Sequence, residues 1–160
     1  MRMQFTVGMG RNEKIEEIEA HARAAEESGF FHITFGDQQN LNNDVYVMMT
    51  IAALNTHRIH IGHGGTNPIT YHPSIIANGT NSLNNLSGGR AFIGIGTGGN
   101  VPLTMGLRPA PLSDLRDAIL FIKKYMRGEE AEYKGAKMHL EVVGGMNPAP
   151  VYLASRWPAR

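Results

Sequence analysis

The stretch that decides the fold of this chain is Ile59–Gly99, which reads IHIGHGGTNPITYHPSIIANGTNSLNNLSGGRAFIGIGTGG. It holds two strand-like runs, Arg58–Gly62 and Ala91–Ile95, and each of them leads directly into glycines. A buried strand that ends in glycine exposes bare backbone, which a flat or phosphorylated ligand can approach closely. In α/β proteins the carboxyl ends of the strands are where ligand sites are built. This stretch therefore predicts both a fold class and a site.

The same strand-and-helix unit recurs along the chain. Strands are predicted to begin near residues 3, 31, 58 and 91, a spacing of roughly 30 residues that is typical of one β-α unit. The predicted helices cover 13–28, 45–55, 73–86 and 113–126, with Asn12, Asp44, Pro73 and Ser113 at their starts. A small hairpin is predicted over 133–140 and a fifth strand over 150–154. Alternating strands and helices indicate a parallel sheet.

Two architectures contain such a sheet. An open, doubly wound sheet of five strands would be complete at this length, whereas an eight-unit barrel needs about 250 residues. The fifth predicted strand is followed only by Ser155–Arg160, so no helix covers it within the chain. We therefore predict an α/β fold that is the N-terminal half of a (β/α)8 TIM barrel. Residues 1–160 would form one partial barrel domain, truncated after the fifth strand.

Composition excludes several classes of protein. With 42% hydrophobic and 18% charged residues, the chain is expected to fold into a globular domain. Fifteen basic and fourteen acidic residues give a net charge of +1, which favours neither nucleic acid nor an anionic membrane as a partner. The absence of cysteine excludes disulfides and thiolate chemistry. No signal peptide or spanning helix is apparent in the sequence, so we expect a cytoplasmic location.

The glycines of Gly94–Gly99 match the GxGxxG spacing of a dinucleotide-binding fingerprint. Such a fingerprint opens a helix whose N-terminus holds a pyrophosphate. Here Pro102, Pro109 and Pro111 crowd the region where that helix would run, and no acidic strand end follows at the required distance. The sequence therefore disfavours a Rossmann site.

Two other features allow more than one interpretation, and a third, a pair of histidines, does not predict a site. Asp37, after the second strand, is either a loop carboxylate that binds backbone amides or a group at the mouth of a barrel. Gly64 and Gly65 indicate either a bulge or a plain turn. His60 and His63 are three residues apart on a strand and thus face opposite sides, so no metal site is expected from them.

Several motifs together resemble the luciferase-like family of flavin- and deazaflavin-dependent oxidoreductases. They are GHGGTNP at Gly62–Pro68, YHP at Tyr71–Pro73, LSGGR at Leu86–Arg90, FGD at Phe35–Asp37 and NNDVY at 42–46. The resemblance extends over nearly the whole chain. It is strongest to the branch of methylenetetrahydromethanopterin reductases that depend on coenzyme F420.

The resemblance implies an eight-fold barrel that moves a hydride between F420, or reduced FMN, and a small organic substrate. It further implies a homodimer at full length and a catalytic role for Asp37. A non-proline cis peptide is implied at the Gly64–Gly65 bond. The cofactor-binding residues that it implies are Gln38, Gly64, Gly65, Thr66, Thr97 and Gly98.

The chain departs from the family pattern in three ways. Gln38 stands where many relatives have histidine, and Gly99 stands where several F420 enzymes have an acidic residue. The later loops that usually grip the cofactor phosphate would lie beyond Arg160. Two alternatives therefore stay open: an FMN-dependent monooxygenase that activates oxygen, and a non-catalytic half barrel that assembles with a partner.

Overall fold

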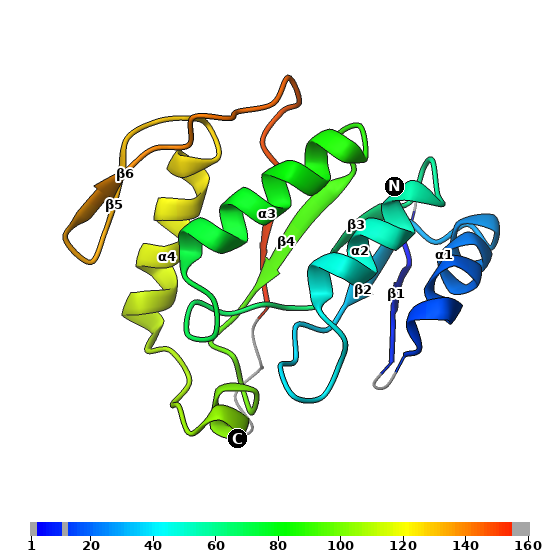
Figure 1. The fold of residues 1–160 in the computed structure, drawn as a ribbon, viewed down its shortest axis with the longest axis horizontal. Helices are drawn as coiled ribbons and strands as arrows, with labels where there is room; N and C mark the ends of the chain where they lie inside the picture. Colours follow the sequence, from blue (N-terminus) through cyan, green and yellow to red (C-terminus); the bar gives the residue numbers. More distant parts are fainter. Residues whose placement is uncertain (1–2, 11–12, 155–160) are drawn as a thin grey trace.

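The computed structural model describes residues 3–10 and 13–154, and it contains a five-stranded parallel sheet (Figure 1). The strands of this sheet are β1 (Thr6–Gly8), β2 (His32–Phe35), β3 (His60–His63), β4 (Ala91–Ile95) and β7 (Val151–Leu153). They lie in the order β1-β2-β3-β4-β7, and each neighbouring pair is parallel. The prediction of parallel strands separated by helices is confirmed.

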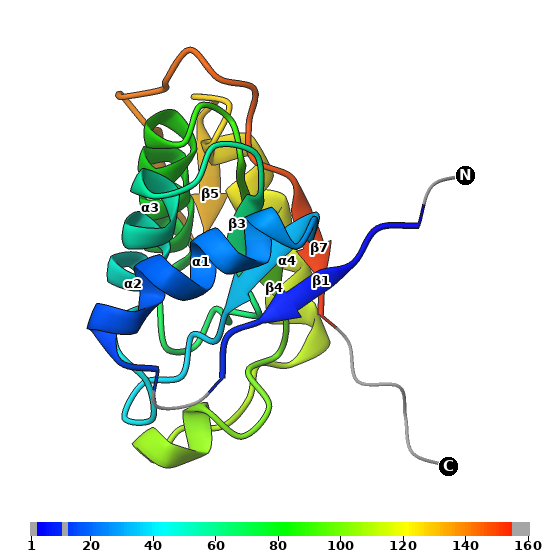
Figure 2. The ribbon, with the colours of Figure 1, turned by 90° about the vertical axis from the view of Figure 1, so that its right-hand side faces the viewer.

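Helices follow the first four strands of this sheet. They are α1 (Ile18–Glu27), α2 (Val45–Leu54), α3 (Pro73–Leu86) and α4 (Leu112–Tyr125), with 3-10 turns at Ile15–Glu17 and Pro102–Met105. The predicted hairpin is present as β5 (Ala131–Tyr133) and β6 (Ala136–Met138), beside α4. Figure 2 shows α1, α2 and α3 together on one side of the sheet. Within the described ranges, no helix is long and apolar enough to cross a membrane.

The core lies between the sheet and these helices. Every second strand residue faces the helices, and Ile33, Phe35, Ile61, Ile93 and Ile95 are all fully buried there. The apolar stripes of the helices pack on these side chains. Burial on this side fixes the register of each strand, because a slip by one residue would turn its apolar side chains away from the helices.

Two predicted helix starts are confirmed, and the first helix ends in a left-handed glycine. The Asp44 carboxylate accepts hydrogen bonds from the backbone N–H groups of Tyr46 and Val47, as an N-cap residue should. Pro73 is the first residue of α3, where its missing N–H costs nothing. Gly29 follows α1 with φ of +79°, the left-handed conformation that commonly ends a helix.

The predicted N-cap of the fourth helix, Ser113, lies two residues after the observed N-cap, Pro111. The helix begins at Leu112, directly after Pro111, and Ser113 lies inside its first turn. The Ser113 hydroxyl donates to the Asp114 carboxylate instead of capping the helix backbone. Pro111 adopts φ of −56° and an extended ψ, so the chain enters the helix without a side-chain cap. The predicted cap of the first helix, Asn12, lies outside the described residues.

Arg90 of the LSGGR motif links the ends of α2 and α3 and the segment before β3 by hydrogen bonds. The Arg90 guanidinium donates to the backbone carbonyl groups of Ala53, Thr56, Ile59 and Ser87 at 2.8 to 3.0 Å. A guanidinium offers five N–H donors in a rigid fork, so one side chain can satisfy several orphan carbonyl groups. Arg90 therefore has a structural role at the amino end of β4, opposite the glycine-rich end.

Candidate functional site

A hollow of about 520 Å³ opens at the carboxyl ends of the strands. We call it the glycine-walled hollow, and its lining residues are Gln38, Leu41, Gly64, Gly65, Thr66, Gly96, Thr97, Gly98, Gly99, Asn100, Val101, Thr104 and Ala154. All six residues that the sequence suggested as cofactor-binding are among them. The structure thus brings together residues from the ends of β2, β3 and β4 that lie up to sixty positions apart in the chain.

Three glycines of this wall have a specific reason to lack a side chain. A Cβ atom on Gly65 would lie 2.9 Å from the Gly94 carbonyl oxygen, and one on Gly96 would lie 2.6 Å from that of Ala154. Gly98 has φ of +99°, a conformation that other residues rarely adopt. Backbone therefore forms much of the wall, and a flat ligand can approach it closely.

The expected cis peptide is absent. No cis peptide bond occurs in residues 3–10 and 13–154, so the Gly64–Gly65 bond is trans. The Gly64 N–H donates to the Phe35 carbonyl at 2.7 Å, and the Thr66 N–H donates to the Gly94 carbonyl at 2.7 Å. With trans bonds, the segment after β3 continues to pair with the strand on either side, which satisfies its buried backbone groups.

Asp37 lies beside the glycine-walled hollow but does not line it. The residue is only 2% exposed, and the Thr66 hydroxyl donates to Asp37 Oδ2 at 2.5 Å. The Gln39 amide donates to the other carboxylate oxygen. Burial raises the pKa of Asp37 to about 6. The hydrogen bonds from Thr66 and Gln39 oppose this rise, and the nearby charge of Asp44 adds to the rise. The carboxyl group can therefore change its charge near neutral pH.

The two strand histidines lie apart, as their spacing predicted. The His60 ring contacts Phe31 and His32, with ring centroids 4.7 and 5.7 Å away. His63 instead packs its ring edge-to-face on Tyr46 of α2, 5.3 Å between centroids. Burial lowers the pKa of His63 to about 4, so this ring is neutral at physiological pH. Among the described residues no cluster of three or more metal-ligating side chains occurs.

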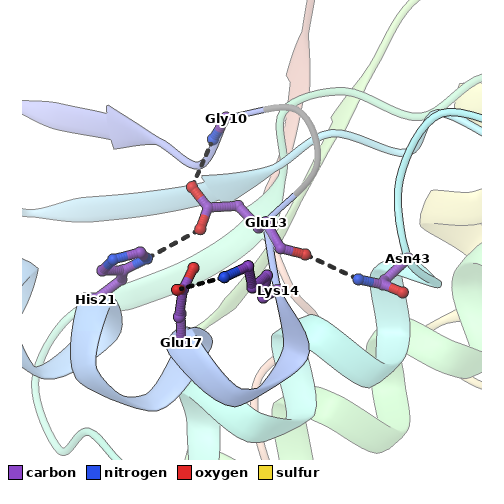
Figure 3. Close-up of polar contacts among 6 residues, drawn as sticks. All are labelled: Gly10, Glu13, Lys14, Glu17, His21 and Asn43. Carbon is purple, nitrogen blue, oxygen red and sulfur yellow. Dashed lines mark hydrogen bonds and ion pairs between the residues drawn. The ribbon is translucent and has the colours of Figure 1, made fainter.

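A polar cluster ties together the loops after β1 and β2 at the rim of the sheet (Figure 3). The Glu13 carboxylate accepts from the Gly10 N–H at 3.2 Å and contacts His21 Nδ1 at 2.9 Å. The backbone carbonyl of Glu13 accepts from the Asn43 side-chain amide at 2.8 Å. Glu13 therefore holds the loop after β1 against the loop that precedes α2.

Sequence reasoning missed some of these residues. Gln39 follows Asp37 by two positions, yet no motif marked it as the partner of that carboxylate. Asn100, Val101 and Thr104 line the glycine-walled hollow from the 3-10 turn region after β4. The proline-rich sequence there indicated only that a long helix could not form, so its contribution to the wall depends on tertiary structure.

A parallel β/α sheet with a glycine-walled hollow at its carboxyl edge is typical of α/β proteins that bind ligands at that edge. The chain belongs to the family described as luciferase-like monooxygenase, which matches residues 2–159. The family resemblance inferred from the motifs is thereby confirmed.

Individual relatives agree with this assignment. The 5,10-methylenetetrahydromethanopterin reductases of Archaeoglobus fulgidus and Methanolobus tindarius are 34% and 32% identical to the chain and cover 98% of it. The structure of the coenzyme F420-dependent tetrahydromethanopterin reductase from Methanopyrus kandleri superimposes with a TM-score of 0.82 at 28% identity, over 96% of this chain and 50% of that one.

The chain spans about half the length of the curated relatives it matches, 48% and 49% in these two cases. The solved reductase structure is likewise covered only by half. The fold is therefore that of half of a (β/α)8 barrel, as predicted from the strand spacing together with the uncovered fifth strand. The doubly wound alternative does not apply.

Proposed function

We propose that this chain provides the cofactor-facing half of an oxidoreductase site. It would bind coenzyme F420, or FMN, in the glycine-walled hollow and support hydride transfer to or from a small organic substrate. The observation that carries the proposal is the convergence of Gln38, Gly64, Gly65, Thr66, Thr97 and Gly98 on one hollow. Hydride transfer requires mainly that two carbons be aligned in a dry pocket, and backbone walls provide a rigid surface for that alignment.

The relatives favour F420 over FMN as the cofactor. The three reductases named above are all named for a tetrahydromethanopterin substrate, and the solved one is named as dependent on F420. When bound, the deazaflavin would supply the hydride. The residues of this chain would supply the flat wall, the neighbouring amide of Gln38 and the buried carboxyl of Asp37. Residues 1–160 would then act as one partial barrel domain.

Titration of the chain with F420 and, separately, with FMN tests this proposal. We expect the fluorescence of the cofactor to change on binding, and Asn100→Trp to weaken binding at least tenfold because Asn100 lines the hollow. Asn147→Trp is the matched control, since Asn147 is exposed and lies before β7, at the other end of the sheet. Equal binding by the two variants would contradict the proposed location.

An FMN-dependent monooxygenase is the second candidate, because the family that matches the chain is described as luciferase-like monooxygenase. The two candidates differ in their use of oxygen. A monooxygenase consumes oxygen in the presence of reduced FMN, whereas an F420-dependent reductase transfers its hydride under anaerobic conditions. Oxygen uptake measured with an electrode therefore separates them.

We place the protein in the cytoplasm, acting on a small molecule rather than on nucleic acid, which agrees with a net charge of +1. We also propose a homodimer for the full-length protein. A non-catalytic half barrel that assembles with a partner would instead bind neither cofactor while forming a stable complex.

A further inference from the structure

We propose that the Thr66 hydroxyl carries a proton between the Asp37 carboxyl group and an acceptor atom held in the glycine-walled hollow. The inference rests on the proposed function, because that function places the acceptor there. Thr66 is one of the residues that line the hollow, and Asp37 is not; both residues are only 2% exposed. Asp37 lies behind Thr66, joined by the hydrogen bond of 2.5 Å between Thr66 Oγ1 and Asp37 Oδ2. Asp37 thus reaches the hollow through Thr66.

A threonine hydroxyl has one proton to donate and two lone pairs to accept with. While Asp37 is ionised, the Thr66 proton points to Oδ2, and Thr66 can only accept a hydrogen bond from a ligand. When Asp37 is protonated, it can donate to Thr66 Oγ1, which frees the hydroxyl proton for an acceptor in the hollow. The protonation of Asp37 therefore decides which hydrogen bond Thr66 offers.

The proton step balances within the pair and the ligand. The O–H bond of the Asp37 carboxylic acid breaks as a new O–H bond forms at Thr66 Oγ1. The original O–H bond of Thr66 breaks as the ligand atom is protonated, and Asp37 is left as a carboxylate. A C=N or C=O group that takes a hydride at carbon from a flavin-class or deazaflavin-class donor needs one proton at its heteroatom. The pair can supply that proton.

The surroundings leave Asp37 as the group suited to this role. Asp44 is engaged by two backbone N–H groups at the start of α2 and by the Tyr71 hydroxyl at 3.3 Å. Burial raises the pKa values of Tyr46 and Tyr71, so both phenols stay neutral. His63 packs against Tyr46 and is neutral as well. The other carboxylate oxygen of Asp37, Oδ1, accepts from the Gln39 side-chain amide, which cannot pass on a proton.

Proton uptake on ligand binding tests the inference. Calorimetric titration of the chain with F420 or FMN at pH 7.5, in two buffers with different ionisation enthalpies, gives the number of protons taken up. We expect close to one proton for the wild type and for Thr66→Ser, which keeps the hydroxyl. Thr66→Val should bind with at least a threefold loss of affinity and with no proton uptake. Equal uptake in Thr66→Val and in the wild type would overturn the relay.

A second measurement needs no ligand and separates this inference from the proposed function. In protein labelled with ¹³C at aspartate carboxyl carbons, the Asp37 signal should titrate near pH 6 in the wild type. Removing the Thr66 hydroxyl should move the midpoint upward in Thr66→Val, because the charged form loses a hydrogen bond. Thr66→Ser should restore it. Failure to bind either cofactor overturns the proposed function. An unchanged titration midpoint of Asp37 in Thr66→Val overturns the proposed coupling between Thr66 and Asp37.

Discussion

At the scale of single residues, Asp37 should make the protein less stable as pH rises. Its pKa in the folded protein is about 6, compared with an ordinary value of 3.8, so folding favours the protonated form. Stability from this group is full below pH 4 and declines as pH rises to 6. The loss amounts to about 3 kcal/mol at most, from about 1.4 kcal/mol for each pKa unit. Asp37→Asn should remove this dependence.

Urea unfolding of both proteins at pH 4.5 and 7.5 measures the effect. The free energy of unfolding of Asp37→Asn, relative to that of the wild type, should be larger at pH 7.5 than at pH 4.5. Other titrating groups are common to both proteins, so they cancel in the difference. A difference in the free energy of unfolding that is the same at both pH values would show that Asp37 is not desolvated as the structure indicates.

His63 has the opposite dependence on pH. Its pKa of about 4 in the folded protein lies below the ordinary 6.5, so the unfolded chain binds the proton more tightly. Stability from this group is present above pH 6.5 and falls as pH drops toward 4, by about 3 kcal/mol at most. His63→Leu should abolish this loss, because no described residue forms a hydrogen bond of normal geometry with either ring nitrogen.

Thermal unfolding followed by circular dichroism between pH 4 and 8 checks this prediction. His57→Gln is the control, since His57 is exposed at the surface. Its melting temperature should follow that of the wild type at every pH. Parallel curves for His63→Leu and the wild type would mean that His63 is not the acid-sensitive group.

At the scale of elements, Glu26 joins the end of α1 to the start of β3. Its carboxylate accepts from the backbone N–H groups of His57, Arg58 and Ile59 at 2.6 to 3.2 Å. Partial burial opposes the charge, but the three N–H groups outweigh it and lower the pKa of Glu26. Glu26→Ala should lower the free energy of unfolding by about 2 kcal/mol, since hydrogen bonds to charged groups contribute about 1.5–3 kcal/mol.

The adjacent Glu27→Ala provides the matched control, because Glu27 is exposed on the same turn of α1. It should change stability by no more than about 0.5 kcal/mol. The Glu26 contribution is present above its unfolded pKa and is lost as pH falls through the lowered folded pKa. Similar losses for Glu26→Ala and Glu27→Ala at pH 7 would contradict the bridging role.

The elements that the sequence could predict are those set by local chemistry. Asp44 and Pro73 mark their helices because a cap and an N-terminal proline act within one turn. The start of α4 was missed because a proline can replace a side-chain cap there. The roles of Glu26 and Arg90 could not be predicted, because each depends on residues more than 30 positions away.

The same distinction applies to the candidate site. The glycine-ended strands could be placed at one edge because parallel strands share their direction. The link between Asp37 and Thr66 joins residues 29 positions apart, and only the register of β2 and β3 brings them together. The Gly64–Gly65 bond is trans, unlike the family expectation. With the bond trans, the N–H groups of Gly64 and Thr66 donate to carbonyl groups of the neighbouring chain segments on either side.

At the scale of the whole molecule, α2 and α3 present a face without any charged residue. Neither helix contains Asp, Glu, Lys or Arg. The helices are neighbours (Figure 1), and Val47, Leu54 and Ile75 on them are 46%, 62% and 51% exposed. A charge-free helix pair that exposes several large apolar side chains is commonly covered by a partner. A two-fold interface places one patch against itself, which a charge-free face permits without repulsion.

We therefore expect the proposed homodimer to form through this face. Val47→Glu should weaken dimerisation by about 30-fold or more, which corresponds to a loss of about 2 kcal/mol, because it places two like charges near the two-fold axis. Leu112→Glu is the control, since Leu112 is 77% exposed on α4, away from this face. Light scattering coupled to size-exclusion chromatography distinguishes the outcomes. A monomeric full-length wild type would contradict the dimer. Dissociation caused by Leu112→Glu alone would move the interface to α4, where Leu112 and Leu120, together with Leu153 of β7, line an apolar hollow of about 510 Å³.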